Sequence, residues 1–245
     1  MAQVLIYAAV FLASVVSGML GIGVAFAALP ILSFGGGDLV HELQPVALFL
    51  NGITALFSAL AFWRAGYVQW RRAASVSLVA TVFAPLGALL AQYTAPGLLW
   101  SAYLGAVLLV LGLTFIGHTT EPRPNAFVKA LAATAPIALF SAMLGVGPGF
   151  LLVPVMLYLG WSARSAAATN AVAVVPSSLA ALLPHLGSAT VNVAQYAPIV
   201  ALAAVAALLG GQLASHRIPD RWLRYLFAGS LAGLALYKTF SLFGS

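Results

Sequence analysis

The sequence contains very few charged residues. Of its 245 residues, 10 are Lys or Arg and 4 are Asp or Glu, so 6% are charged, whereas about a quarter of the residues of an ordinary soluble domain are charged. Apolar residue types make up 63% of the chain, and the mean hydropathy is +1.07. So few ionic side chains cannot cover a water-facing surface without leaving large apolar patches. This composition excludes soluble enzymes and nucleic-acid-binding proteins.

Cysteine and long runs of one charge are also absent. Without cysteine there are no disulfides, thiolate metal sites or cysteine nucleophiles. The formal net charge is +6, but no basic run is longer than Arg71-Arg72, so we interpret the positive excess as a signal of membrane orientation. The N-terminal segment MAQVLIY lacks a basic n-region, and its apolar run is longer than that of a signal peptide. We therefore expect this segment in the mature protein.

Six apolar segments are long enough to cross a bilayer as straight helices. They cover residues 43–63, 73–93, 97–117, 165–184, 194–214 and 221–241. Two further apolar stretches, 4–34 and 127–159, are too long for one straight pass and too short for two, and glycines interrupt each of them. All five tryptophans fall at or just beyond the segment ends, where the membrane interface favours them. The sequence therefore predicts an all-α polytopic membrane protein.

The chain contains an internal repeat. SGMLGIGVAFAALP at residues 17–30 matches SAMLGVGPGFLLVP at residues 141–154, at a constant offset of 124. After a five-residue excess in the first copy, the match continues by pairing Asn51 with Asn170, Ser58 with Ser177, Gly87 with Gly210 and Pro96 with Pro219. We therefore predict two repeats, residues 1–120 and 121–245, each with one broken segment followed by three transmembrane helices.

The ten basic residues indicate how the two repeats are related. If each broken segment crosses the membrane once, the repeats are parallel and Arg164 lies on the face opposite Arg64. If each broken segment enters and leaves on the same side, nine of the ten basic residues lie on one face, and only Lys238 does not. Because basic loops favour the cytoplasm, we predict inverted-topology repeats with re-entrant hairpins and both termini outside. A short arginine-bearing loop that violates this rule would leave the parallel arrangement open.

The glycine-rich tips of the two predicted hairpins would meet near the membrane midplane, each followed by a short apolar helix. The residues concerned are Gly21, Gly23 and Phe26 in the first tip, and Gly145, Gly147, Gly149 and Phe150 in the second. A helix N-terminus carries about half a positive charge and unpaired N–H donors. Two such ends would bind an anion without a buried Arg or Lys, which costs about 2.5 to 3.5 kcal/mol at the bilayer centre. The alternative is that these glycines only permit close helix crossing, but their duplication beside a break favours a binding site.

Uncharged polar residues follow each hairpin at equivalent positions. They are Asn51 and Ser58 after the first hairpin, and Thr169, Asn170 and Ser177 after the second. An Asn exposed to lipid is costly, so we expect these amides to face the bundle interior. There they can donate to an oxyanion or hydrogen-bond a neighbouring helix. Gln92 and Gln212 are weaker candidates near the segment ends, and we expect His185 and His216 at the surface or in loops.

The four acidic residues are all assigned to loops. They are Asp38, Glu42, Glu121 and Asp220. Proton-coupled carriers commonly use an intramembrane carboxylate as a relay, so we expect none here. A coupled proton would travel on the substrate or through a histidine at the interface.

The repeated motifs resemble those of the sulfite exporter TauE/SafE family of membrane transporters. The resemblance rests on the duplicated G-x-G-x-x-F-x-x-x-P segment, the A-x-x-T-N element at residues 166–170 and the G-x-V-x-W element at residues 66–70. It covers nearly the whole chain, and it implies transport of sulfite, sulfonates or other small organic anions across the cytoplasmic membrane. The transport region implied by the family consists of Gly21, Gly23, Gly145, Gly147, Gly149, Asn51 and Asn170. Family members often have a third glycine where this chain has Val24-Ala25, so the first tip is expected to approach the substrate less closely.

These observations favour a secondary transporter for a small anion that works by alternating access. The alternatives are a channel-like anion facilitator and a non-transporting membrane assembly subunit. An enzyme is not expected, because no nucleophile with a base and no metal cluster is found at helical spacing. We expect no cofactor, no metal and no nucleic acid, and the partners are a small anionic substrate and the lipid bilayer. A homo-oligomer is compatible with the sequence.

Overall fold

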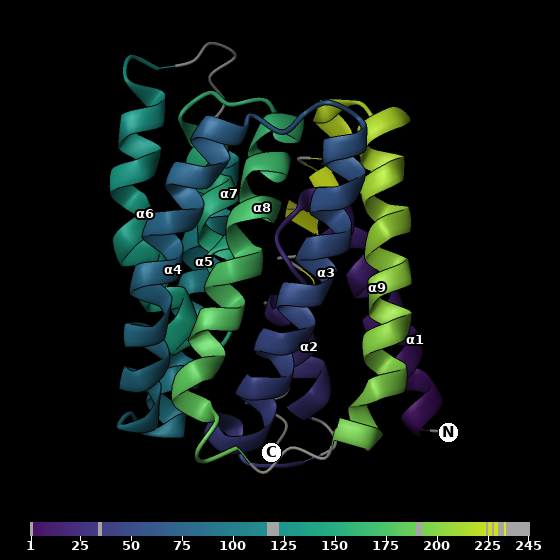
Figure 1. The fold of residues 1–245 in the computed structure, drawn as a ribbon, viewed down its shortest axis with the longest axis vertical. Coiled ribbons are helices and arrows are strands. Elements are labelled where there is room, and N and C mark those ends of the chain that lie inside the picture. Colours follow the sequence, from purple (N-terminus) through teal and green to yellow (C-terminus); the bar gives the residue numbers. More distant parts are fainter. Residues whose placement is uncertain are drawn as a thin grey trace.

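The computed structural model describes residues 2–33, 36–116, 123–189 and 193–223, and also residues 225, 226, 228, 229 and 233. Within these residues the only regular secondary structure is helical (Figure 1). The helices are α1 (Ala2–Leu20), α2 (Ala25–Leu32), α3 (Gln44–Arg64), α4 (Trp70–Gln92), α5 (Pro96–Ile116), α6 (Ala126–Met143), α7 (Gly149–Tyr158), α8 (Ala163–Leu182) and α9 (Val193–His216). A π-helical turn, η2 (Leu39–Leu43), precedes α3, and a 3-10 turn, η3 (Leu183–His185), follows α8. The predicted all-α fold class is confirmed.

Five of the six predicted straight segments are single helices. They correspond to α3, α4, α5, α8 and α9, and their ends differ from the predicted ends by no more than three residues. The sixth, 221–241, lies mostly outside the described residues. By length and hydropathy, five helical stretches of the described chain can cross a bilayer: Leu39–Arg64, Trp70–Gln92, Ala126–Met143, Ala163–His185 and Tyr196–His216. Their outward surfaces are apolar, as Leu78, Val82 and Leu86 on α4 illustrate, which suits contact with lipid chains.

Both long apolar stretches are broken helices, as predicted. The first is interrupted at residues 21–24 between α1 and α2, and the second at residues 144–148 between α6 and α7. The breaks contain residues with left-handed backbone: φ is 64° at Gly21, 76° at Gly23, 73° at Gly145 and 69° at Gly147. Glycine adopts this region without the steric cost of a Cβ atom. The paired glycines therefore turn the chain sharply where each helix stops.

The two hairpins open towards opposite ends of the bundle. Arg123, just before α6, donates its backbone N–H to the carbonyl oxygen of Leu159, just after α7, at 3.0 Å. The α6–α7 hairpin therefore begins and ends at one place, the top of the molecule in Figure 1, which we call the upper end. The α1–α2 hairpin begins and ends at the bottom, the lower end, together with η2 and η3 (Figure 1). Each hairpin therefore begins and ends at one end of the bundle, whereas the inverted topology of the two repeats across a membrane stays a prediction.

The two halves of the chain are interleaved. α3 and α8 pack together at the centre, α4 packs against α6 and α8, and α9 packs against α1 and α3. Gly87 on α4 lies against the backbone of Leu139 on α6, and Gly210 on α9 lies against the backbone of Val15 on α1. Leu139 and Val15 are separated by the same 124 residues as the two copies of the repeat, so these close contacts are equivalent. The proposed boundary between residues 120 and 121 lies outside the described residues and stays a prediction.

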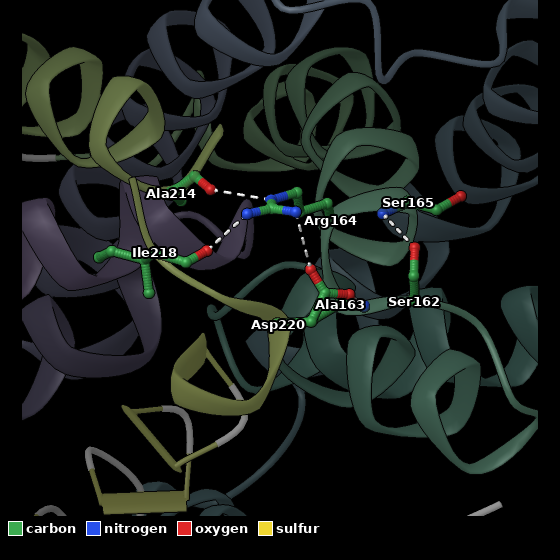
Figure 2. A network of polar contacts seen from close by, with 7 residues as sticks. All are labelled: Ser162, Ala163, Arg164, Ser165, Ala214, Ile218 and Asp220. Carbon is green, nitrogen blue, oxygen red and sulfur yellow. Dashed lines mark hydrogen bonds and ion pairs between the residues drawn. The ribbon is translucent and has the colours of Figure 1, made fainter. Parts of the chain in front are cut away.

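An arginine network fastens α8 to the end of α9 at the upper end (Figure 2). Arg164 donates to the carbonyl oxygens of Ala214 at 3.1 Å and Ile218 at 2.7 Å, and it pairs with Asp220 at 3.4 Å. The Asp220 carboxylate also accepts the backbone N–H of Ala163 at 2.8 Å. Asp220 was expected in a loop, but the structure makes it the first residue of helical backbone at residues 220–223. Its carboxylate is used to hold the start of α8.

Two predictions at the lower end were wrong. Glu42 was assigned to a loop, but it lies in η2, which runs directly into α3. The Asp38 carboxylate caps this turn by accepting the N–H groups of Val40 and His41 at 2.9 and 2.7 Å, and the bond from His41 holds the pKa of Asp38 below its ordinary value. His185 was expected at the surface, but it is 1% exposed. Its segment, η3, continues α8 without a break and packs against α4, which buries the ring.

We predict that Gly87→Ala destabilises the protein, because the new methyl group would overlap the backbone of α6. Overpacking of this kind costs about 1 to 3 kcal/mol, so the melting temperature of the purified protein should fall. Gly105→Ala on α5 is the matched control, since a Cβ atom there has no neighbour within 4 Å. Equal melting temperatures for the two variants would contradict the tight α4–α6 contact.

Candidate functional site

The tips of the two hairpins meet inside the bundle, between α3 and α8. Gly23 and Gly147 both lie against the side chain of Asn51 on α3. Gly149 lies against the side chain of Asn170 on α8 and the backbone of Ile22. A Cβ atom at any of these three glycines would overlap its neighbours, so the close approach of the tips requires glycine. Residues separated by more than 120 positions in the sequence thus form one site.

The start of α2 is capped by side chains of α3. Asn51 Oδ1 accepts the backbone N–H of Ala25 at 2.9 Å, and Thr54 Oγ1 accepts that of Val24 at 3.1 Å. Asn51 Nδ2 donates to Ser178 Oγ at 2.9 Å. An N–H group can only donate, so the contact with Ala25 fixes which end of the Asn51 amide is the oxygen. Both ends of this amide are therefore used within the protein.

The start of α7 lacks such a cap. Asn170 Nδ2 donates to the carbonyl oxygen of Gly21 at 2.7 Å, whereas Asn170 Oδ1 is buried without a hydrogen-bond partner among the described residues. Pro148, which precedes α7, has no N–H, and it is the counterpart of Val24 in the repeat. Across the described chain, no hydrogen bond involves the N–H groups of Gly149 or Phe150. The two hairpin tips are therefore alike in shape and different in their free donors.

Three stacked aromatic rings cover the tips on one side. The Phe26 and Phe150 rings have centroids 6.2 Å apart, and the Phe150 and Tyr103 centroids are 6.1 Å apart. The Tyr103 hydroxyl donates to the carbonyl oxygen of Phe26, which satisfies a backbone group of α2. All three rings are buried. The two predicted phenylalanines thus shield the site and bring α5 against it.

Every one of the predicted site residues is buried, but the structure divides them into three groups. Gly21, Gly23, Phe26, Asn51, Gly145, Gly147, Gly149, Phe150 and Asn170 belong to the two tips or contact them. Ser58 instead donates to the carbonyl oxygen of Gly18 at 2.7 Å, and Ser177 to that of Ala173 on its own helix at 2.9 Å. These two serines bind helix backbone. The Thr169 hydroxyl is buried without a partner among the described residues.

Sequence reasoning missed two residues that complete the site, Thr54 and Ser178. Thr54 lies one turn after Asn51, and this helical spacing was the signal that could have identified it. Ser178 lies next to Ser177, and only the pairing of α3 with α8 shows which of the two hydroxyls faces Asn51. The weaker candidates lie elsewhere: Gln92 donates to the carbonyl oxygen of Pro184 at the lower end, and Gln212 lines a cavity at the upper end.

The electrostatics of the site come from the backbone. The side chains that hydrogen-bond to the tips are Asn51, Thr54, Asn170 and Tyr103, all uncharged. The uncapped start of α7 supplies two N–H donors and the positive end of a helix dipole. In the part of the chain that the structure describes, no group of three His, Asp or Glu side chains could hold a metal ion. The chemistry available at the tips is therefore hydrogen bonding to a ligand.

These features define a polytopic membrane protein with two broken hairpins that meet inside a helical bundle. The chain belongs to the sulfite exporter TauE/SafE family, whose model matches residues 6–238. A relative in Sinorhizobium fredii (strain NBRC 101917 / NGR234), the probable membrane transporter protein y4hK, is 28% identical over 197 residues, which cover 76% of this chain and 78% of the relative. No solved structure matches the chain. The resemblance seen in the sequence is confirmed, and the protein is a multi-pass membrane transporter.

We predict that Thr54→Val destabilises the protein, although the two side chains have similar volumes. The substitution removes the acceptor for the buried N–H of Val24, and an unpaired buried N–H costs about 1 to 3 kcal/mol. Thr81→Val on α4 is the control, because the Thr81 hydroxyl bonds only to Ser77 of its own helix. Thermal unfolding should separate the two variants, and a Thr54 variant as stable as the Thr81 variant would show that this cap is unimportant.

Proposed function

We propose that the protein is a secondary transporter that moves a small anion, sulfite or an organosulfonate or organic acid, by alternating access. The observation that carries this proposal is the uncapped start of α7, because no hydrogen bond in the described chain involves the N–H groups of Gly149 and Phe150. The side-chain amide of Asn170 lies against Gly149, and its Oδ1 has no partner among the described residues. A helix N-terminus with free donors is an anion-binding structure. Its location where two hairpins from opposite ends meet suits a transport site, because broken helices form the binding sites of many transporters.

The anion is bound at the second tip rather than equally by both. At the first tip, Thr54 and Asn51 already occupy the N–H groups of Val24 and Ala25. At the second tip, the donors of Gly149 and Phe150 remain available to the oxygens of a ligand. Glycine at position 149 lets the ligand approach the backbone closely. The absence of a third glycine in the first tip agrees with this division.

The free Oδ1 of Asn170 further defines the ligand. The amide orientation is determined by the contact with Gly21, because a carbonyl oxygen can only accept a hydrogen bond. Oδ1 therefore offers an acceptor, which repels a fully deprotonated oxyanion and attracts an O–H or N–H group. A ligand with both kinds of group satisfies the site. Hydrogen sulfite and amino-substituted sulfonates have them, whereas sulfate has no donor.

The packing of the hairpins supports alternating access. The α6–α7 hairpin is joined to the upper end and the α1–α2 hairpin to the lower end (Figure 1). Each long arm packs through a glycine contact against a helix of the other half, α6 against α4 and α1 against α9. Movement of one hairpin with its partner helix would open the site to one end while the other hairpin keeps it closed. All tip residues are buried, and in this proposal that arrangement is the occluded state.

The upper end is the cytoplasmic face in this proposal. Eight described basic residues belong to segments that meet there: Arg64, Arg71, Arg72, Arg123, Lys129, Arg164, Arg217 and Arg221. The positive-inside rule then places the upper end in the cytoplasm of a cell with a cytoplasmic (inner) membrane, with the start of α1 outside. Arg224 and Lys238 lie outside the described residues. The lipid bilayer and the anion are the partners.

We predict that Asn170→Leu abolishes transport while the protein stays folded. The variant loses the Oδ1 acceptor and one hydrogen bond, so uptake of labelled sulfite into proteoliposomes should fall about tenfold or more. Ser101→Ala on α5, whose hydroxyl bonds only to Gly97, should transport normally. Counterflow of labelled sulfite into vesicles preloaded with sulfite is expected for a carrier. A channel-like facilitator would show no counterflow. Normal sulfite kinetics in the Asn170 variant would remove this residue from the site.

We also predict the membrane orientation. The chain has no cysteine, so single cysteines can be introduced without a background. Arg71→Cys places an exposed thiol at the upper end, and Leu186→Cys, at a position 74% exposed, places one at the lower end. In intact cells an impermeant maleimide should label only the Leu186 variant. Labelling of the Arg71 variant instead would reverse the proposed orientation.

A further inference from the structure

A basic cavity of about 530 Å³ lies at the upper end, away from the hairpin tips. It is formed by the start of α4, the start of α6 and the segment that joins α7 to α8. Its polar lining residues are Gln69, Arg72, Arg123, Asn125, Ser162 and Ser165. The ten residues of α7 separate it from Gly149, a distance of about 15 Å at the rise of an α-helix. It is therefore a separate place in the molecule from the tip site.

Both arginines of this cavity are held by aromatic rings. The guanidinium carbon of Arg72 lies 5.7 Å from the ring centroid of Phe127 and 5.5 Å from that of Trp161. That of Arg123 lies 3.9 Å from the ring centroid of Tyr158. Stacking on a ring fixes the plane of a guanidinium group and leaves its N–H donors at the edge available. Two planar groups with five donors each are thus positioned around one cavity.

Among the described residues, no carboxylate compensates the positive charge of the cavity. None of the described residues that line it is Asp or Glu, and in the same part of the chain the ion pairs are His41 with Asp38 and Arg164 with Asp220. Glu121 lies outside the described residues. Arg164 differs from the two arginines of the cavity, because its guanidinium group donates hydrogen bonds to the carbonyl oxygens of Ala214 and Ile218 and forms an ion pair with Asp220 (Figure 2). Arg72 and Arg123 make no such bonds within the described chain. Like charges placed together without a counter-charge favour the binding of an anion.

We propose that this cavity binds a tetrahedral oxyanion of the phosphate or sulfate type, with Arg72 and Arg123 as its two charged ligands. Arginine matches such oxygens with paired, charge-assisted hydrogen bonds. Gln69, Asn125 and the hydroxyls of Ser162 and Ser165 supply further hydrogen-bonding groups around it. The source of the oxyanion is either a free anion from the cytoplasmic side or the headgroup of an anionic phospholipid. In both cases the ligand joins α4 to the outer end of the α6–α7 hairpin.

The test uses the full-length protein in nanodiscs. In phosphatidylcholine nanodiscs, calorimetric titration with inorganic phosphate measures binding of a free anion. In nanodiscs that contain phosphatidylglycerol, native mass spectrometry measures retention of the anionic lipid. We expect Arg72→Gln and Arg123→Gln to weaken phosphate binding or retention of the anionic lipid about tenfold or more. The control is Arg71→Gln, which removes an equal charge from an exposed residue outside the cavity and should have little effect.

A second variant keeps the test informative if loss of the stacked arginines unfolds the upper end. Asn125→Asp places a carboxylate in the cavity without disturbing either stack, and Asp tolerates the left-handed backbone of Asn125, whose φ is 56°. This variant should also lose binding. Asn170→Leu at the tips should leave it unchanged, so this proposal and the transport proposal can fail separately. Binding of phosphate and lipid that is the same in the Arg72, Arg123 and Asn125 variants as in Arg71→Gln would overturn the proposal.

Discussion

The central constraint on this molecule is that every backbone N–H and C=O group exposed by a helix break inside an apolar bundle must find a partner. Two helices stop in the middle of the bundle, at residues 21–24 and 144–148. The groups freed at the first break are paired with Asn51, Thr54 and Asn170. The central pair of helices, α3 and α8, is therefore organised around polar side chains directed at the breaks, in a chain otherwise dominated by apolar contacts.

The two copies of the repeat meet this constraint in different ways. In the first copy a donor, the N–H of Val24, is matched by an acceptor, the hydroxyl of Thr54. In the second copy the equivalent donor is absent because the residue is Pro148, and the residue equivalent to Thr54 is Ala173, which has no hydroxyl. In each copy, therefore, the backbone donor and the hydroxyl acceptor are either both present or both absent. The consequence is that one tip is closed by the protein, whereas the Gly149 and Phe150 N–H groups of the other make no hydrogen bond within the described chain.

Interleaving of the halves connects this site to the rest of the bundle. Because α9 packs on α1 and α4 packs on α6, neither half can shift a hairpin without involving a helix of the other. The glycine contacts at Gly87 and Gly210 bring those backbones into close contact, which suits the coupled movement that we propose. At the upper end, Arg164 fastens α8 to α9, whereas Arg72 and Arg123 remain available on either side of a cavity. The same residue type thus fastens two helices in one place and, in our proposal, binds an anion in another.

Hydropathy and glycine positions were sufficient to predict five straight helices and the two breaks, because helix length, glycine positions and apolar composition are local properties of the chain. The family was indicated by the resemblance of the repeated motifs and is confirmed by the match to its model. Asn51 and Asn170 were also identified from the sequence, but their different roles were not. The sequence shows two equivalent amides. Only the packing of both tips between α3 and α8 determines that both ends of the Asn51 amide form hydrogen bonds, whereas Oδ1 of Asn170 has no partner among the described residues. Likewise, the burial of His185 and the choice of Ser178 over Ser177 depended on which helices lie side by side. Such contacts join residues far apart in the sequence, such as Asn51 and Ser178, which are separated by 127 positions, and no local pattern encodes them.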